Sequence, residues 1–592
     1  MNDSAGDRRG LVDRELLRRV GLAFGTVAVL LIVTNLAALQ QARFPDPDDT
    51  LRMVQVRDLL AGQAWLDLAQ HRVDAPHGGV PMHWSRLVDI PLAGTILLLA
   101  PFLGQANAEV AAMVLVPLVT MGLALLLAGR IAWRFLRGDE VLFACFALAI
   151  SVPVIHQLRP LRVDHHGWQI VLALLAANGL AARSRRVGGW IIGLALAAWL
   201  AISIEALPLT AVFAGVLALR WLRDGAQRAW LLHAMLALAV GSALFFLATR
   251  GLTDLANHCD AVSPVHLAIF GWGALGIAAL AVAGRRALAV ELAGFAAIGG
   301  GALAILYAAA PVCTGGGFSE LDPLVRAFWY ENVAEGLPVW RQKPADILQL
   351  LVPAGVALQA AVRLARRGSE GERAFWTDYA ILLAGAVAIS LMVARAGAVA
   401  AALAATPLGW QIAEWYRAAK RLDRPGKRAA VLTAMALALV PAMPFTLFKL
   451  VVPARAAGVA PVAHASSCDI RRWGPQLRRL GSAEVLAPLD IGPGLLYESR
   501  LEVFATGHHR GNQAMRETIR LFLGSSEAAR QALRARGTKY VALCTDLSEP
   551  AGYARVAPKG FGAQLIEGKA LSWLEPVIAP KSSSFRLWRV TR

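Results

Sequence analysis

The sequence predicts a polytopic α-helical membrane protein with a smaller C-terminal soluble domain of α/β or α+β class. The chain has 592 residues, of which 57% are hydrophobic and only 17% are charged, and its mean hydropathy is +0.51. A water-soluble protein of this length needs more charge to cover its surface. Apolar runs of roughly 17–25 residues recur through the first three quarters of the chain, and a run of this length crosses a ~30 Å hydrocarbon layer.

The formal net charge of +18 raises the alternative of a nucleic-acid-binding protein. The basic residues, however, fall in short connectors between apolar runs, which is where the positive-inside rule places them in membrane proteins. We therefore expect a membrane protein with no nucleic-acid partner.

The order of apolar runs and basic connectors predicts a topology. The first run, Gly21–Leu39, follows a basic N-terminus and lacks a small-residue cleavage site, so it is expected to be an uncleaved span with a cytoplasmic N-terminus. If all basic connectors are cytoplasmic, residues 1–451 contain about 13 spans, and residues 452–592 lie on the periplasmic side of a bacterial-type inner membrane. The run Ile90–Gly104 is short for a span and fits a helix on the outer membrane surface.

The tail from residue 452 lacks the long apolar runs of the preceding chain. A helical pattern covers Asn512–Arg536, and short β-branched or aromatic runs predict strands. These strands are Ala483–Leu489, Leu501–Ala505, Tyr540–Cys544 and Phe585–Val590. The mixture predicts a domain of about 140 residues, a common domain size.

Ionisable groups near a membrane are costly, so their positions carry information. Three expected outward loops hold such groups, and the residues are Asp46, Asp48, Asp49, Asp164, His165, His166 and Glu335. Each group alone is more often a helix cap or a solvated loop. On one side of the membrane, however, they can converge, and carboxylates with an imidazole suit Mg²⁺ or Mn²⁺. Such an ion can neutralise a lipid-linked phosphate leaving group.

Two further places hold candidate residues with open alternatives. Glu205 lies at the expected outer end of a span, where it either lines a sugar pocket or snorkels and caps the helix. His509 and Arg510 follow the strand that ends at Ala505, where they either contact a phosphate or form a solvated turn.

Taken in order, these motifs resemble the catalytic subunit of oligosaccharyltransferase, a GT-C glycosyltransferase. The segment Asp46–Arg52 resembles that family's Asp-Pro-x-x-x-x-Arg signature, and Asp164-His165-His166 resembles its second acidic motif. The segment Asn332–Pro338 resembles the family's loop motif around a glutamate, here Glu335. Arg395 is similar to the arginine that contacts the donor phosphate. The resemblance covers the membrane half of the chain.

The resemblance implies a function and a role for each matched residue. Asp46, Asp164 and His166 would bind a divalent cation, Mg²⁺ or Mn²⁺, and Glu335 would act near the metal or the acceptor. Arg395, with Arg52 as a second candidate, would bind the donor phosphate. The implied reaction moves a sugar or oligosaccharide from a polyprenyl-(pyro)phosphate donor to an extracytoplasmic glycan, lipid or protein, with inversion at the anomeric carbon.

The resemblance ends in the tail. The family's Trp-Trp-Asp-Tyr-Gly motif, which recognises the asparagine acceptor, is absent between Ser466 and Arg592. Protein asparagine oligosaccharyltransferase is therefore the alternative within the enzymes. A polysaccharide or lipid transporter is the alternative from another class, but its charged groups are expected near the bilayer midplane and often in repeated halves. This sequence has its ionisable clusters in loops and shows no repeat.

The five cysteines test the topology independently. Cys145 falls within a predicted span and is expected to remain a buried thiol. The other four fall on the expected outer side, where pairing is favoured, and four cysteines allow 3 connectivities. The favoured pairs are Cys259–Cys313 and Cys468–Cys544, and the alternative is that some cysteines stay unpaired.

Overall fold

The computed structural model describes residues 13–284, 287–445, 466–580 and 582–591. The basic N-terminus, the pair Arg285 and Arg286, and the expected domain boundary after residue 451 lie outside these residues. The chain divides into two compact units. Unit 1 consists of Met1–Arg43, Ser85–Gly317 and Ala334–Val451, and unit 2 consists of Phe44–Trp84, Phe318–Val333 and Val452–Arg592.

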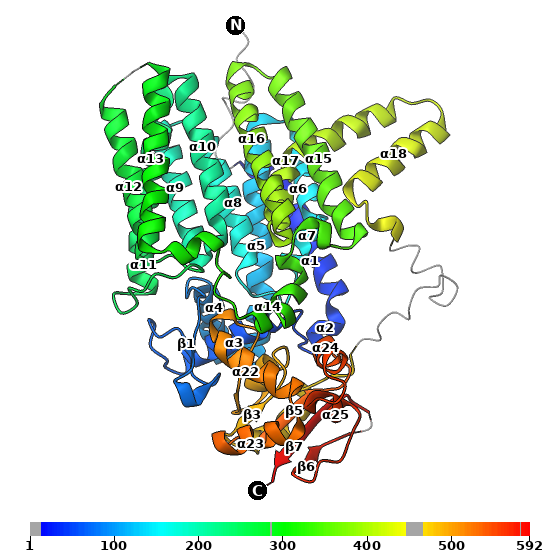
Figure 1. Cartoon of the computed structure of the whole chain (residues 1–592). Coiled ribbons are helices and arrows are strands. Elements are labelled where there is room, and N and C mark those ends of the chain that lie inside the picture. Colours follow the sequence, from blue (N-terminus) through cyan, green and yellow to red (C-terminus); the bar gives the residue numbers. More distant parts are fainter. Residues whose placement is uncertain (1–12, 285–286, 446–465, 581, 592) are drawn as a thin grey trace. The chain divides into compact units, whose positions relative to one another are not determined.

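Unit 1 is a bundle of membrane helices (Figure 1). Among the described residues, ten helices are long and apolar enough to cross a membrane, or eleven if the bent pair α6 and α7 forms one span. They are α1 (Arg14–Thr34), α5 (Gln105–Phe135), α6 (Gly138–Ala149) with α7 (Val152–Leu158), α9 (Arg185–Ile202), α10 (Leu207–Arg223), α11 (Arg228–Thr249), α12 (Pro264–Val282), α13 (Leu288–Ala309), α15 (Pro344–Arg367), α16 (Glu370–Met392) and α17 (Gly397–Lys420). The polytopic helical fold is confirmed.

The count of ten or eleven is lower than the 13 spans expected from the sequence. The difference lies in two helices of 15 residues, α8 (His166–Leu180) and α18 (Pro425–Leu439). A helix of this length is about 22 Å long, shorter than the hydrocarbon layer. A third 15-residue helix, α4 (Asp89–Leu103), packs against α5 and covers the run expected to form a surface helix. Its place relative to the bilayer stays a prediction.

Glycines bring α9 unusually close to α11. A Cβ atom on Gly193 would lie 2.2 Å from the carbonyl oxygen of Ala234, and one on Gly189 would lie 2.7 Å from that of Trp230. Neither position accepts a side chain without movement of the backbone. Small residues at this spacing let membrane helices approach closely, because dispersion contacts rather than a hydrophobic effect hold them together.

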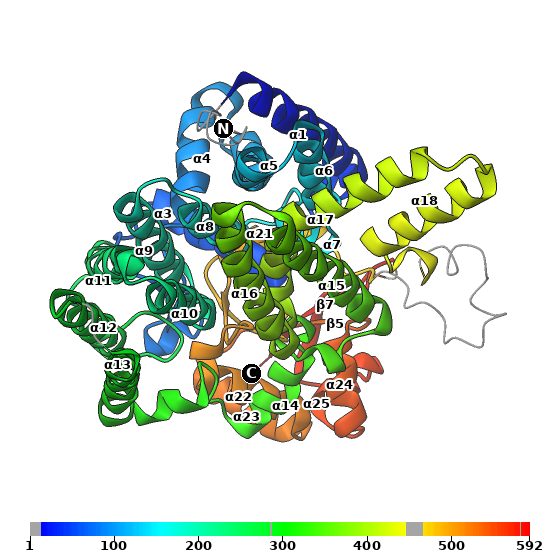
Figure 2. The ribbon, with the colours of Figure 1, turned by 90° about the horizontal axis from the view of Figure 1, so that it is seen from above.

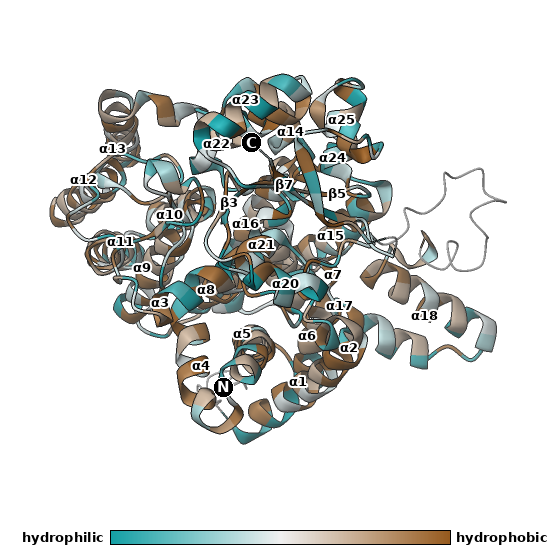
Figure 3. Ribbon diagram, turned by 90° about the horizontal axis from the view of Figure 1, so that it is seen from below, coloured by the Kyte–Doolittle hydropathy of each residue, from teal (hydrophilic) through white to brown (hydrophobic). Residues whose placement is uncertain are grey.

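The helices of unit 1 differ in how much of their surface is covered. Most residues of α17 from Gly397 to Ala413 are buried, whereas α13 has no buried residue. Figure 2 shows α17 near the middle of the helices of unit 1 and α13 at their edge. The helices of unit 1 are mostly apolar in Figure 3, so an outer helix such as α13 presents a surface suited to lipid.

Unit 2 is built on a five-stranded mixed sheet with the order β4-β3-β5-β7-β6. Strand β3 pairs in parallel with β4 and β5, whereas β7 pairs antiparallel with β5 and β6. The bounds are Glu484–Leu486 for β3, Glu502–Val503 for β4, Tyr540–Cys544 for β5, Leu574–Ile578 for β6 and Phe585–Val590 for β7. The four predicted strands are present, and the sheet adds β6. The C-terminal mixed α/β class is thus confirmed.

The two faces of this sheet pack against different helices. On one face, Val485 and Ala542 belong to a core that includes Leu51 and Val54 of α3 (Pro47–Leu60). On the other face, Val541 belongs to a core with helices of the tail and with α14 (Pro323–Phe328). Those tail helices are α22 (Asn512–Leu523), α23 (Ser526–Arg536), α24 (Ser548–Val556) and α25 (Phe561–Ile566). Because successive side chains of a strand point to opposite faces, each face of the sheet has its own core. The segments Phe44–Trp84 and Phe318–Val333 fold with the tail because each contributes to one of these cores.

Both favoured disulfides are present. Cys259 pairs with Cys313 in unit 1, and Cys468 pairs with Cys544 in unit 2. Cys145 is a buried free thiol. The cysteine predictions are confirmed.

Candidate active site

Six of the sequence candidates meet in one polar network in unit 1. They come from four places: the loop before α8 with the first residue of α8, and three short 3-10 turns, η2 (Ile204–Ala206), η6 (Ala334–Gly336) and η8 (Ala394–Ala396), the last directly before α17. The residues are Asp164, His165, His166, Glu205, Glu335 and Arg395.

The Asp164 side chain has two structural tasks in this network. One carboxylate oxygen accepts a hydrogen bond of 2.9 Å from the backbone N–H of His166, which is the first residue of α8. The other oxygen lies 3.4 Å from Nη2 of Arg162 and 3.6 Å from Nε2 of His166. All three residues are buried. The aspartate thus caps the start of the helix and also faces two basic groups.

Glu335 connects this pair to the rest of the network. Its carboxylate lies 3.7 Å from Nη2 of Arg162, 3.8 Å from Nε2 of His166 and 3.8 Å from Nη1 of Arg395. Its side chain is 30% exposed, compared with 3% for Asp164. Of the two carboxylates, Glu335 is therefore more accessible to a soluble molecule than Asp164.

Arg395 and Glu205 form the other end of the network. Nη1 of Arg395 lies 3.2 Å from the carboxylate of Glu205. The second oxygen of Glu205 accepts a 3.1 Å hydrogen bond from Nε2 of Gln169, which itself lies 3.3 Å from Nδ1 of His166. A backbone hydrogen bond of 3.1 Å from Ala394 to Leu337 ties η8 to the segment after η6. The network is continuous from Asp164 to Arg395.

The charges in this network favour an ionised Asp164. Burial alone would raise the pKa of the Asp164 carboxyl, but the charges of Arg162, His166 and His165 outweigh burial and hold the pKa well below its ordinary value. An ionised carboxylate beside two imidazoles is a metal-binding chemistry. Ligand atoms of Asp164, His165 and His166 lie within 4.8 Å of one another. Mixed oxygen and nitrogen donors suit Mn²⁺ or Zn²⁺ better than Mg²⁺, which prefers oxygen ligands alone.

The remaining sequence candidates lie in unit 2. Asp46 is the N-cap of α3, and its side chain accepts a 2.9 Å hydrogen bond from the backbone N–H of Asp48. Asp49 is fully buried, and the buried guanidinium of Arg52 lies 4.4 Å from the ring centroid of Trp84. The capping role considered for this aspartate cluster is therefore real. The metal set of Asp46 with Asp164 and His166 draws on both units and stays a prediction.

His509 and Arg510 lie in the short turn η10 (His509–Gly511) of unit 2. The ring of His509 packs against those of His83 and His508. His509 and Arg510 are half-buried, and the preceding His508 is buried, so the turn is only partly solvated.

Sequence reasoning missed polar residues in both units. Arg162 and Gln169 flank the Asp-His-His motif, and Gln169 lies three residues after His166, on the same face of α8. Spacing therefore carried a signal for both residues. In unit 2, no sequence motif singles out Glu549 or Asp490. The fold brings them together: the carboxylate of Glu549 accepts hydrogen bonds from the backbone N–H groups of Leu489 and Asp490, at 2.8 and 2.9 Å.

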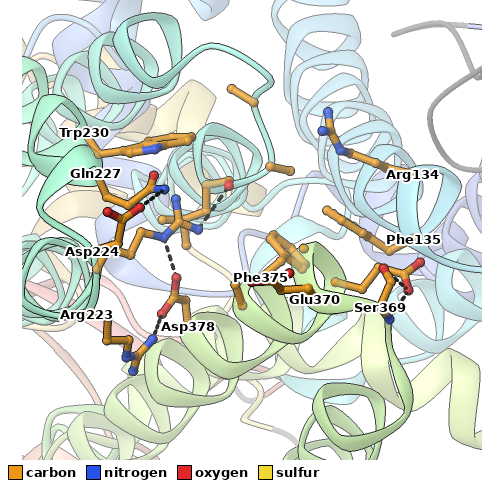
Figure 4. Close-up of a pocket in the computed structure, with 17 residues that line it drawn as sticks. Arg134, Phe135, Arg223, Asp224, Gln227, Trp230, Ser369, Glu370, Phe375 and Asp378 are labelled. Carbon is orange, nitrogen blue, oxygen red and sulfur yellow. Dashed lines mark hydrogen bonds and ion pairs between the residues drawn. The ribbon is translucent and has the colours of Figure 1, made fainter. Parts of the chain in front are cut away.

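Unit 1 also has a cavity of about 610 Å³ that belongs to another part of the bundle (Figure 4). Asp378 of α16, which is buried, forms ion pairs there with Arg220 and Arg223 of α10. Three arginines line this cavity, against four carboxylates. The cavity therefore has no excess of positive charge for a phosphate group, and its ion pairs hold α10 to α16.

Comparisons with known proteins place this fold. No protein-family model and no curated protein matches the chain. Among solved structures, the oligosaccharyltransferase AglB of the archaeon Archaeoglobus fulgidus, in complex with an inhibitory peptide and a dolichol-phosphate, matches with a TM-score of 0.65 and 13% identity, over 97% of this chain and 74% of that chain.

Two further structures of the same archaeal enzyme also match. The form tethered to an acceptor peptide with the NVT sequon has a TM-score of 0.64 and 14% identity, over 97% of this chain and 74% of that chain. The complex with zinc and sulfate has a TM-score of 0.57 and 13% identity, over 95% of this chain and 72% of that chain. The chain thus has a fold similar to that of this archaeal oligosaccharyltransferase.

Proposed function

We propose that this protein is a membrane glycosyltransferase of the GT-C type that uses a polyprenyl-linked sugar donor. The observation that carries the proposal is the network of three carboxylates, two arginines and two histidines at the helix ends of unit 1, within a fold similar to that of AglB. The reaction breaks the bond between the anomeric carbon and the phosphate oxygen of the donor. A hydroxyl or amide of the acceptor forms the new bond to the anomeric carbon and loses its proton to solvent, and the polyprenyl phosphate or pyrophosphate leaves.

The metal belongs to this proposal as a bound cofactor. Asp164 and His166 would hold a divalent cation, Mg²⁺ or Mn²⁺, with His165 as a further ligand, and the sequence motif adds Asp46. When bound, such a cation stabilises negative charge on the departing phosphate. The archaeal structure that contains zinc supports a metal in this fold, and the mixed donor set adds Zn²⁺ to the candidates.

The protein groups around the cation divide the remaining work. Arg395 would bind a phosphate of the donor, because a guanidinium that pairs with carboxylates presents the same donor geometry to a phosphate. Arg52 is the second candidate for this role, from the sequence motif. Glu335, the more exposed carboxylate, would orient the acceptor group. Arg162 would keep Asp164 ionised and in place.

The acceptor separates the main proposal from its nearest alternative. A glycan or lipid acceptor follows from the absence of Trp-Trp-Asp-Tyr-Gly in the tail. Transfer to asparagine is the second candidate, because the matched archaeal structure holds an acceptor peptide with the NVT sequon. The position of the charged network at helix ends favours an enzyme over a transporter with a midplane site.

The proposal is tested with purified protein in proteoliposomes and the lipid-linked donor that co-purifies with it. We expect release of free polyprenyl phosphate, detected by mass spectrometry. Asp164→Ala and a chelator should each reduce the release by roughly 100-fold or more, and added Mn²⁺ should restore it only after the chelator. Asp346→Ala, which changes an exposed aspartate at the start of α15, is the matched control and should keep full activity. Unchanged release in Asp164→Ala would overturn the metal role.

A further inference from the structure

Three histidines of unit 2 form a compact cluster separate from the Asp-His-His motif. They are His83, which follows strand β2 (Val80–Pro81), and His508 and His509 at the turn η10. Ring nitrogens of the three side chains lie within 4.8 Å of one another. Nδ1 of His83 lies 2.8 Å from Nε2 of His508, and each pair of ring centroids is 4.8 to 5.1 Å apart. Residues 425 positions apart in the sequence thus meet at one point.

The close contact between His83 and His508 joins two ring nitrogens. A hydrogen bond between two ring nitrogens needs one N–H donor and one lone pair. A lone pair on an imidazole nitrogen is also the group that binds a metal ion. The pair therefore already presents one nitrogen in the form of a metal ligand.

Surrounding aromatic residues hold the three rings in place. Trp84 packs edge-on against His508 with centroids 5.6 Å apart, and Phe318 packs edge-on against His509 at 4.9 Å. The backbone at Gly507 also lies close to Trp329: a Cβ atom on Gly507 would lie 2.9 Å from the indole nitrogen of Trp329. A packed frame of this kind pre-orients ligands and lowers the entropy lost on binding an ion.

We propose that His83, His508 and His509 form a second metal site of this protein, a three-histidine site for Zn²⁺. Zinc binds imidazole nitrogens at about 2.0–2.1 Å in tetrahedral geometry, which places the nitrogens roughly 3.4 Å apart. The cluster reaches this spacing with small ring movements, since its nitrogens already lie within 4.8 Å. The fourth position remains for water or an anion.

The site joins segments that are distant in sequence. His83 belongs to the segment Phe44–Trp84 of unit 2, and His508 and His509 belong to the tail. Phe318 is the first residue of the remaining segment, Phe318–Val333. Binding of zinc would therefore stabilise unit 2 by linking its first loop to its tail. This role is independent of the proposed sugar transfer and of the Asp164 site.

The test measures metal content and affinity in the full-length protein. Metal-free protein in detergent is titrated with Zn²⁺ and, for its visible spectrum, with Co²⁺. We expect two bound ions per chain in the unmodified protein and a tetrahedral Co²⁺ spectrum that persists in Asp164→Ala. His83→Gln, His508→Gln and His509→Gln should each weaken one of the two binding events by roughly 100-fold or more, above the 10- to 100-fold effect of losing an outer-shell partner.

His71→Gln is the matched control, because His71 lies in the same loop and pairs with Asp67 on the surface. It should keep both ions. Zinc should also raise the thermal unfolding midpoint of Asp164→Ala, but not that of a double variant that combines Asp164→Ala with His83→Gln, because only the double variant lacks both sites. His83→Gln keeps the test valid if His508→Gln fails to fold, because His83 is only half-buried. Two bound ions in the folded His83→Gln variant, or zinc binding lost only in Asp164→Ala, would overturn the second site.

Discussion

Arg162 shows how one buried residue controls the chemistry of the network in unit 1. It lies between Asp164 and Glu335, at 3.4 and 3.7 Å, and its side chain is 1% exposed. A buried carboxylate without such a partner takes up a proton. Arg162 therefore helps, together with His165 and His166, to hold Asp164 in the ionised form.

Arg395 is the residue on which donor binding should depend most directly. Arg395→Lys keeps the positive charge but loses the planar fork, so the apparent KM for the donor should rise about tenfold, as expected for one lost charge-assisted hydrogen bond. The value of kcat should change less. Arg341→Lys, an exposed arginine of the same unit, is the matched control for steady-state kinetics with the lipid-linked donor. An unchanged KM in Arg395→Lys would mean that its role is confined to the ion pairs with Glu205 and Glu335.

Glu549 should make the stability of unit 2 depend on pH. Burial, and then the charge of Asp490, raise the pKa of the Glu549 carboxyl from 4.5 to about 8. The folded unit thus keeps a proton that the unfolded chain has released, and its stability falls as the pH rises from about 4.5 to about 8. Asp490→Asn removes one cause, so the fall should shift to lower pH. Thermal unfolding at several pH values checks this, with Glu567→Gln on the surface as control; identical profiles for Asp490→Asn and the unmodified protein would contradict it.

The sequence predicts those site residues that belong to short motifs. Asp164, His165, His166, Glu335 and Arg395 follow from motif order along the chain. His83 does not, because its histidine partners are 425 and 426 positions away and only the fold brings them together. The buried environments of Asp490 and Glu549 likewise depend on packing that no local pattern records.

At the scale of elements, residue preferences predict the start of helix α3 but not strand β6. Strand β6 contains Glu575 and Pro576, residues that disfavour a central strand, and it was not predicted. It lies at the edge of the sheet, where proline is tolerated. Helix α3 carries the start signal of an aspartate cap followed by proline, and the structure confirms the helix-cap reading of Asp46.

The contact between α9 and α11 gives a prediction about packing. In Gly193→Ala the new Cβ atom would lie 2.2 Å from a backbone oxygen, so the helices must separate. Overpacking of this kind costs about 1–3 kcal/mol, and we expect a lower thermal unfolding midpoint in detergent. Gly299→Ala on α13 is the matched control, because a Cβ atom there meets nothing within 4 Å. Equal midpoints for the two variants would show that α9 and α11 adjust without cost.

At the scale of the whole chain, contacts inside each unit constrain how often the chain crosses the membrane. Asp164 precedes α8 and Glu205 follows α9, yet Gln169 and His166 link both residues to one network. Because α9 is long enough to span, we expect α8 to bring the chain back despite its 15 residues. A short helix can complete a crossing when the bilayer thins locally around it.

The same reasoning applies to the tail. Asp74 of the first loop pairs with Arg536 of the tail at 2.7 Å. The backbone N–H of Asp322 donates a 3.0 Å hydrogen bond to the side-chain oxygen of Asn512, the first residue of α22. The tail therefore lies on the side of the membrane that holds the loop after α1. Helix α17 runs from Gly397, two residues after Arg395 of the network, to Lys420, and the predicted topology has one further crossing between Lys420 and the tail. The topology of 13 spans, an odd number, stays a prediction.

This topology predicts opposite results for reporters fused at two nearby points. If the N-terminus is cytoplasmic, alkaline phosphatase fused after Arg592 should be active and green fluorescent protein fused there should be dark, because each reporter works on only one side of a bacterial inner membrane. Fusions to chains truncated at Asp423, directly before α18, should give the reverse pattern. The truncated fusion thus serves as the internal control for the single crossing between the two points. The same pattern at both points would mean that the chain does not cross after α17, which would contradict the shared side that the Asp74–Arg536 contact requires.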